Sequence, residues 1–100
     1  MAGIRNLMAV GDSITVSLAA STNHQEGTLP TGNDAVLVQN EGPATARVLV
    51  SAGTEVATTA NLPILPGGMY VLRKRLEANH YSVLADGGAV KVHLTPCESD

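Results

Sequence analysis

The sequence predicts an all-β fold, a small β-sandwich or jelly-roll-like barrel of about seven or eight short, mostly antiparallel strands. Three observations support this prediction. Apolar and polar residues alternate in several short segments, turn residues separate these segments, and no long segment has the periodicity of an amphipathic helix. At 100 residues the chain is long enough for one domain, and we expect residues 1–100 to form it.

The predicted strands begin near the N-terminus and recur to the C-terminus. Ile14–Leu18 and Val90–Leu94 alternate apolar with polar side chains, which predicts half-buried strands with one face toward solvent. Val36–Val38 and Val48–Val50 are continuous apolar runs rich in β-branched residues, as in the strands of a sandwich core. Tyr81–Ala85 is a further predicted strand.

The segments between these strands have the residues that turns require. Asn40–Pro43 combines a glycine, which can take a positive φ, with a proline, which cannot donate to a ladder, so it should separate two strands. Ser51–Thr54 is a further turn, and Asp86–Gly88 should join the last two strands as a tight hairpin. Leu62–Gly68, with its prolines and its glycine pair, should cross from one sheet or edge to the other.

Three segments are less regular. Ser21–Asn33 is polar and aperiodic, which predicts a surface loop. Met69–Asn79 has some helical spacing but is short for a helix and follows two glycines, so we interpret it as a strand that ends in a charged turn. The N-terminal segment Met1–Ala9 is either an N-terminal arm or an ordinary first strand.

The composition favours some classes of function over others. Six basic against nine acidic residues give a formal net charge of −3, which argues against a nucleic-acid partner because phosphate binding needs a basic surface. No run approaches the ~20 apolar residues of a membrane span, and Asp12 interrupts any signal peptide, so no membrane partner is expected. Only 15% of the residues are charged, against about 25% in ordinary domains, which suits a packed assembly.

The apolar residues of the chain are small. Tyr70 and Tyr81 are the only aromatic residues, so the core must consist of valine, leucine, isoleucine and alanine side chains. A domain with such a core can gain stability from a partner or from self-association.

One short motif suggests hydrolytic chemistry. Val10–Thr15 resembles the first block of the GDSL-type (SGNH) esterases, in which the serine, here Ser13, is the nucleophile. That family has a residue between the glycine and the asparagine of a later block, whereas Gly32 and Asn33 are adjacent. It also has an aspartate two residues before the catalytic histidine, whereas Asp86 stands seven residues before His93. A serine without a positioned base is a weak nucleophile, so an esterase fragment that uses Ser13 is only a remote alternative.

No other pattern predicts catalysis or cofactor binding. His24, His80 and His93 are scattered over a predicted loop, turn and strand, and no cysteine pair or carboxylate cluster joins them, so we expect no metal site. Cys97 is the only cysteine and is interpreted as a spectator thiol. No glycine-rich phosphate-binding motif is present. We therefore expect that the protein is not an enzyme and that it needs no cofactor.

The predicted partner contacts lie in two places. Arg73–Arg75 contains half of all the basic residues, and it is either a solvated strand end or a contact with an acidic surface of a partner. Ile4, Leu7 and Met8 are apolar residues of the N-terminal segment. The predicted contact residues are thus Arg73, Lys74, Arg75, Ile4, Leu7 and Met8.

Residues Asp34 to Thr95 resemble, segment by segment, small tailed-bacteriophage virion proteins of the capsid decoration or cement type. In those proteins a strand that ends in asparagine and a glycine turn precede an Ala-x-Val strand. A Thr/Ala-rich segment, a Leu-Pro-x-x-Pro-Gly connection and an alanine/glycine hairpin follow. The corresponding segments here are Asp34–Asn40, Ala46–Val50, Val56–Ala60, Leu62–Gly67 and Leu84–Val92. The basic cluster and the segment 21–33 are not part of that pattern.

The resemblance implies a virion structural protein that decorates or cements the capsid shell. It would act through multivalent contacts with the major capsid protein and with itself, as a homo-oligomer and often a trimer, on the outer capsid surface. Synthesis would take place in the host cytoplasm. The alternative is a structural or receptor-binding module associated with the tail, baseplate or fibre.

Overall fold

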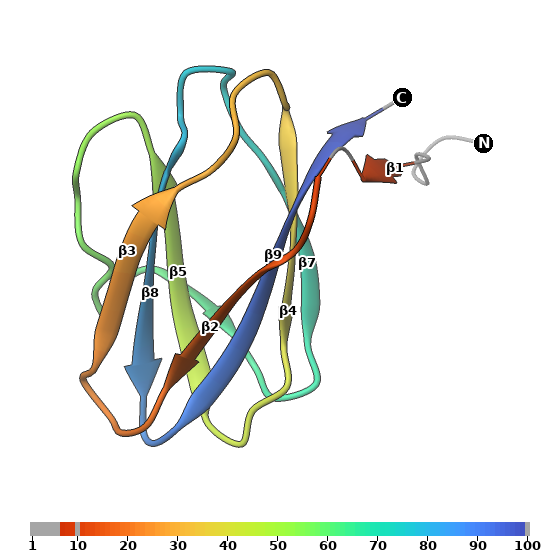
Figure 1. The fold of residues 1–100 in the computed structure, drawn as a ribbon. Helices are drawn as coiled ribbons and strands as arrows, with labels where there is room; N and C mark the ends of the chain where they lie inside the picture. The colour runs from red at the N-terminus through yellow and green to blue at the C-terminus, as the bar shows by residue number, and fades with distance from the viewer. Residues whose placement is uncertain (1–6, 10, 100) are drawn as a thin grey trace.

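The computed structural model describes residues 7–9 and 11–99, which form two antiparallel sheets packed face to face (Figure 1). The first sheet contains β1 (Leu7–Ala9), β2 (Ile14–Leu18), β9 (Val90–Ser99), β4 (Ala35–Asn40) and β7 (Met69–Arg73). The second sheet contains β3 (His24–Thr28), β8 (His80–Asp86), β5 (Thr45–Ser51) and β6 (Leu62–Ile64). The described residues include no helix that is long and apolar enough to cross a membrane.

The strand order is that of a jelly roll. The order β2-β9-β4-β7 in the first sheet faces the order β3-β8-β5-β6 in the second, and every strand pair is antiparallel. From β2 onward, each connection crosses from one sheet to the other, except the one between β5 and β6. The predicted fold class, an all-β sandwich of jelly-roll type, is confirmed.

Most of the predicted strands are confirmed as well. The first alternating segment coincides with β2, and the apolar runs lie within β4 and β5. Met69–Arg73 is a strand that leads into the charged turn, as predicted. The Leu62–Gly68 connection contains the short strand β6 and then crosses to the first sheet.

The prediction of a hairpin at Asp86–Gly88 is wrong. The turn joins β8 to β9, which belong to different sheets and do not pair. Gly87 and Gly88 have φ values of 97° and 155°, so the turn does need glycine. Turn residues specify that the chain reverses its direction, but they do not specify which sheet the next strand joins. In a sandwich, the next strand can bury its apolar face either beside its predecessor or in the opposite sheet.

The prediction of a surface loop at Ser21–Asn33 is also wrong, because this segment contains β3. The positions of β3 that share a face with the buried residues Val83 and Tyr81 are Gln25 and Gly27. The Tyr81 ring occupies the space above Gly27. Because the neighbouring strand supplies the apolar groups on this face, β3 shows no alternation of its own.

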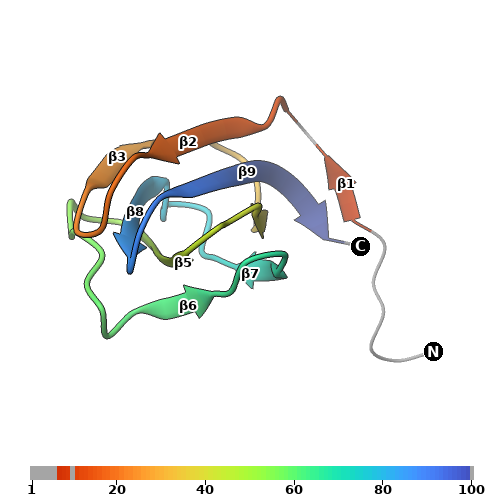
Figure 2. The ribbon, with the colours of Figure 1, turned by 90° about the horizontal axis from the view of Figure 1, so that it is seen from below.

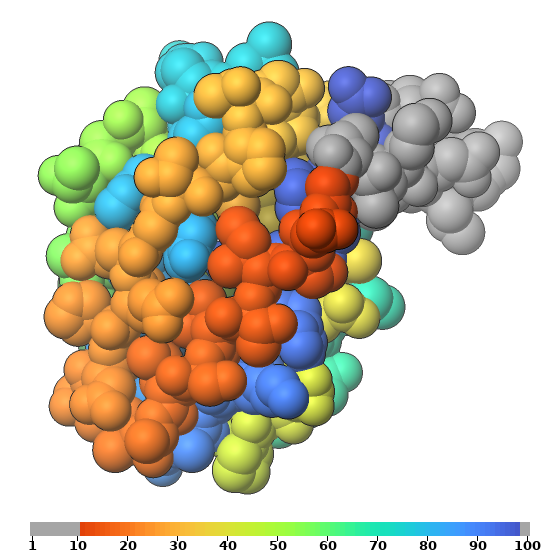
Figure 3. Space-filling model, in the orientation of Figure 1, coloured from red at the N-terminus to blue at the C-terminus, as the bar shows by residue number. Residues whose placement is uncertain are grey.

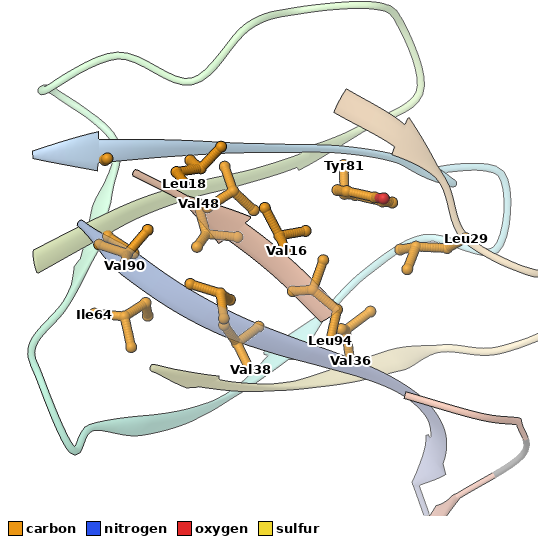
Figure 4. Close-up of a cluster of buried hydrophobic side chains, with 14 residues drawn as sticks. Val16, Leu18, Leu29, Val36, Val38, Val48, Ile64, Tyr81, Val90 and Leu94 are labelled. Carbon is orange, nitrogen blue, oxygen red and sulfur yellow. The ribbon is translucent and has the colours of Figure 1, made fainter. Parts of the chain in front are cut away.

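The core between the sheets consists of small aliphatic side chains, as predicted (Figure 4). Val16, Val38 and Leu94 of the first sheet are fully buried against Val83 and Ile64 of the second. Tyr81 is the aromatic member of this cluster.

The two ends of the chain meet at β9. Leu7–Ala9 pairs with the C-terminal end of β9 in the register Leu7 to Ser99, and β2 pairs with its N-terminal part. Both lie on the side of β9 opposite β4, and Figure 2 shows β1 beyond the N-terminal end of β2. Of the two alternatives for Met1–Ala9, the strand is therefore correct for residues 7–9. Ile4 lies outside the described residues.

Candidate protein-interaction surface

The edges of the two sheets differ in how they are protected. An edge strand exposes unpaired backbone groups, and proteins block such edges with proline, charge or irregular geometry. In the second sheet, β6 carries Pro63, which has no N–H, and β3 carries polar and charged side chains. On β2 the exposed side chains are those of Thr15 and Ser17. These edges are poor templates for a further apolar strand.

The edge at β7 lacks this protection. Met69, Tyr70 and Val71 are consecutive residues with exposed fractions of 61%, 46% and 43%. The strand Met69–Arg73 contains no proline and pairs with β4 in an uninterrupted register, without a bulge. Within the described part of the chain, β7 is thus an open and apolar edge.

The backbone register shows which groups this edge exposes. Lys74 N donates to Asp34 O at 3.0 Å, and Asn40 N donates to Gly68 O at 3.1 Å. In an antiparallel ladder, alternate residues direct their backbone groups to opposite sides. The even-numbered residues of β7 therefore bond to β4, whereas Met69, Val71 and Arg73 direct their N–H and C=O groups toward the open edge.

The turn after β7 carries the predicted basic contacts, and we call residues 73–76 the basic turn. Lys74 is partly buried, and its Nζ donates to Asn79 Oδ1 at 2.9 Å and to Arg75 O at 3.3 Å. Burial lowers the pKa of Lys74 below the ordinary 10.5, against the opposing charges of Asp34 and Glu77. Lys74 thus holds the turn in place, and its role as a partner contact stays a prediction.

The other members of the basic turn face solvent. Arg73 and Arg75 are exposed, and Leu76 is 60% exposed. Residues 74–79 project at one end of the sandwich, cyan in Figures 1 and 3. The open edge of β7 and the basic turn adjoin in the chain, and we call them together the β7 surface.

The predicted contacts at the N-terminus lie elsewhere. Leu7 and Met8 belong to β1, at the edge of the first sheet opposite β7. The structure therefore does not bring the two groups of predicted contact residues together, and a role for Leu7 and Met8 stays a prediction.

A hollow of about 350 Å³ lies beside the basic turn. Gly32, Asp34, Leu76 and Glu98 line it. The two carboxylates give this hollow an acidic rim next to Leu76.

The histidines are less scattered than predicted. His80 Nε2 lies 3.1 Å from Glu26 Oε1, and His24 Nε2 lies 3.6 Å from Glu26 Oε2. Glu26 thus lies between two histidines, because β3 pairs with β8. Among the described residues, no group of three or more His, Cys, Asp or Glu side chains has the geometry to hold a metal ion.

His93 takes part in a second polar group, on the outer face of the first sheet. Its Nδ1 lies 3.2 Å from Thr15 Oγ1, and its Nε2 contacts Glu41 Oε2. The hydrogen bond with His93 and then the charge of Lys91 lower the pKa of Glu41. The order hydroxyl, imidazole, carboxylate occurs in catalytic triads. Thr15 and Glu41 are both exposed to solvent, and we interpret the group as a link between β2, β9 and the turn after β4.

The residues of the esterase-like motif have structural partners. Ser13 Oγ lies 2.5 Å from Thr95 Oγ1, so its hydrogen-bond partner is a hydroxyl group and no histidine base. Asn33 is buried and donates from Nδ2 to Pro30 O at 2.6 Å. Cys97 is buried in β9, and its Sγ donates to Thr95 O at 3.3 Å.

Comparison with known proteins returned no family model, curated protein or solved structure that matches the chain.

Proposed function

We propose that this protein is a bacteriophage virion structural protein that decorates or cements the capsid shell through multivalent protein–protein contacts. The observation that carries the proposal is the β7 surface. An open apolar edge beside exposed arginines is a liability for a freely diffusing monomer, because it invites association. In a protein that functions within an assembly, the same surface can bind the neighbouring proteins.

Three further features support the proposal. Jelly rolls recur in viral capsid proteins, although lectins and cupins share the fold, so this support is by analogy of fold. The resemblance of residues 34–95 to decoration proteins points to the capsid among these classes. The low proportion of charged residues, 15%, suits extensive contact with neighbouring proteins.

The mechanism we propose is collective binding. Arg73 and Arg75 would contact an acidic surface of the major capsid protein on the outside of the shell. Each contact can be weak, because the lattice presents the same site many times and linked copies bind with high avidity. The protein would thereby raise the resistance of the particle to heat and internal pressure.

Sedimentation of the purified protein with emptied capsids tests the proposal. We expect saturable binding at about one or a few copies per capsomer, weakened by salt because exposed charges are screened. Arg75→Glu should reduce the binding by about tenfold or more, since it reverses an interfacial charge. Lys91→Glu changes the net charge by the same amount on another surface and should leave binding unchanged.

Absence of binding to the shell, or equal binding by Arg75→Glu and wild type, would contradict the proposed contact. Imaging of particles that carry the labelled protein separates the alternative location. Few copies at the tail would favour a tail, baseplate or fibre-associated module.

A further inference from the structure

We propose that two copies of the chain associate through β7, antiparallel, around a two-fold axis at Val71. The two first sheets then form one continuous sheet across the dimer. The inference concerns the protein by itself, and it goes beyond the proposed function because it does not require a capsid.

The backbone groups of the open edge are complementary to themselves. Met69, Val71 and Arg73 carry the outward N–H and C=O groups, and they are spaced symmetrically about Val71. A two-fold axis at Val71 places Val71 opposite Val71, and Met69 opposite Arg73 of the second copy. All of these positions become hydrogen-bonded pairs, so every outward backbone group of the strand gains a partner.

The exposed apolar side chains follow the same symmetry. Of the six large exposed hydrophobic residues in the described part of the chain, Met69, Tyr70 and Val71 belong to β7, and Leu65 and Leu76 flank the strand in the sequence. Leu65 and Leu76 lie beyond opposite ends of β7, so an antiparallel arrangement brings the Leu65 end of one copy beside the Leu76 end of the other. Association therefore covers the apolar groups that the monomer leaves in water.

Charge selects the antiparallel orientation. A parallel arrangement would place the two basic turns side by side. In the antiparallel arrangement, Arg73 of each copy is offset by four residues, about 14 Å along the strand. This distance exceeds the Debye length of about 8 Å at physiological ionic strength, so the repulsion is largely screened.

A second copy is the occupant that the edges favour. Among the edges of the chain, β6 is blocked by Pro63, and β3 exposes polar and charged side chains. Among the edge strands whose side chains the structure describes, β7 is the one that offers another β7 exposed apolar side chains and free backbone groups. Arg75 of each copy lies beyond the end of the paired strands, where its side chain can still contact an acidic surface.

Sedimentation velocity of the purified protein tests the inference. We expect reversible conversion from the 10.3 kDa monomer to a dimer as the concentration rises. Val71→Lys should reduce dimer formation by at least about tenfold, because two lysines would face each other at the axis. Val56→Lys is the matched control, since Val56 has the same 43% exposure outside the edge, and it should dimerise like wild type. Circular dichroism verifies that both variants are folded.

Cysteine cross-linking tests the register independently. Hydrogen-bonded antiparallel pairs have Cα atoms about 5.5 Å apart, within the range that a disulfide spans. Val71→Cys should form a disulfide-linked dimer under mild oxidation, because Val71 is the only position opposite itself. Met69→Cys should not, since its neighbour across the axis is Arg73.

A protein that stays monomeric up to ~1 mM would overturn the inference, as would equal dimerisation of Val71→Lys or equal cross-linking of Met69→Cys. A monomer that binds an acidic extended peptide at β7 would also overturn it. Capsid binding by a protein that stays monomeric would overturn the dimer and leave the proposed function intact. A dimer that does not bind capsids would contradict the proposed function and leave the dimer intact.

Discussion

At the scale of single residues, Asn40 connects the two sheets at one end of the sandwich. The side chain is buried at the end of β4, and its Nδ2 donates to Ala44 O at 2.9 Å and to Ile64 O at 2.8 Å. Its Oδ1 accepts from Gly42 N at 2.8 Å. One side chain thus satisfies three backbone groups, one of them on the second sheet.

Replacement of this side chain should be costly. Asn40→Ala removes the partners of buried backbone groups, and we expect the free energy of unfolding to fall by about 3 kcal/mol. Urea denaturation followed by circular dichroism measures this loss. The exposed Asn23 provides the control, because Asn23→Ala removes no buried hydrogen bond. A loss below about 1 kcal/mol would show that water replaces these bonds.

Gly27 is the second residue whose identity the packing requires. A Cβ at this position would lie 2.6 Å from Cζ of the buried Tyr81 ring, closer than atoms approach in folded proteins. Gly27→Ala should therefore lower the free energy of unfolding by about 1–3 kcal/mol, through displacement of the ring.

Gly53→Ala is the matched control for this prediction. Its Cβ would meet the flexible end of the exposed Glu55 at 2.9 Å, and that side chain can move aside. Equal effects of the two substitutions in thermal unfolding experiments would contradict the packing role of Gly27.

At the scale of elements, the turn between β4 and β5 is attached to β9 by backbone and side-chain bonds. Glu41 N donates to Lys91 O at 2.8 Å, and the Glu41 carboxylate contacts His93. Because the hydrogen bond with His93 and the charge of Lys91 lower the pKa of Glu41, the folded state favours the ionised carboxylate.

This pKa shift predicts a pH dependence. A carboxyl group with a lowered pKa stabilises the fold above its ordinary value of 4.5, and that contribution is lost as the pH falls through the lower folded pKa. Glu41→Gln should therefore flatten the loss of thermal stability below pH 4.5. Melting temperatures measured across this range for the wild type, Glu41→Gln and the control Glu98→Gln test it. Parallel curves for all three proteins would contradict the prediction.

At the scale of the whole molecule, the jelly-roll connections determine how the chain must fold. β9 pairs with β1 and β2 from the other end of the chain, and nearly every connection crosses between the sheets. Contacts between residues distant in sequence are slow to form because loops must close first.

We therefore expect folding in milliseconds to seconds, as for other domains dominated by non-local strand pairing. Stopped-flow circular dichroism, together with the fluorescence of the buried Tyr81, measures the rate. Folding in microseconds would mean that a local hairpin, such as β5 with β6, forms most of the structure first.

Association also belongs to this scale. The proposed dimer is two-fold, whereas the resemblance to decoration proteins implies a trimer in many cases. The two differ in sedimentation mass and in symmetry. A two-fold dimer would display its basic turns at opposite ends of one continuous sheet and so connect neighbouring sites on a lattice.

The sequence by itself determined the strands whose own side chains alternate between apolar and polar or form a continuous apolar run. β2 shows its alternation directly, the apolar runs in β4 and β5 mark core strands, and the scarcity of aromatic residues requires an aliphatic core. These properties are local, because side chains in a strand alternate between its two faces whatever its partner.

The tertiary structure alone decided the features that depend on which strands pair with each other. β3 is a strand because β8 supplies its ladder and the Tyr81 ring covers Gly27, so no alternation marks it. The crossing of Asp86–Gly88 between sheets, the meeting of His24 and His80 at Glu26, and the partial burial of Lys74 all follow from register. The open edge at β7 likewise exists because β4 pairs with only one side of it. Pairing between distant segments is a property of the whole chain, and no local pattern encodes it.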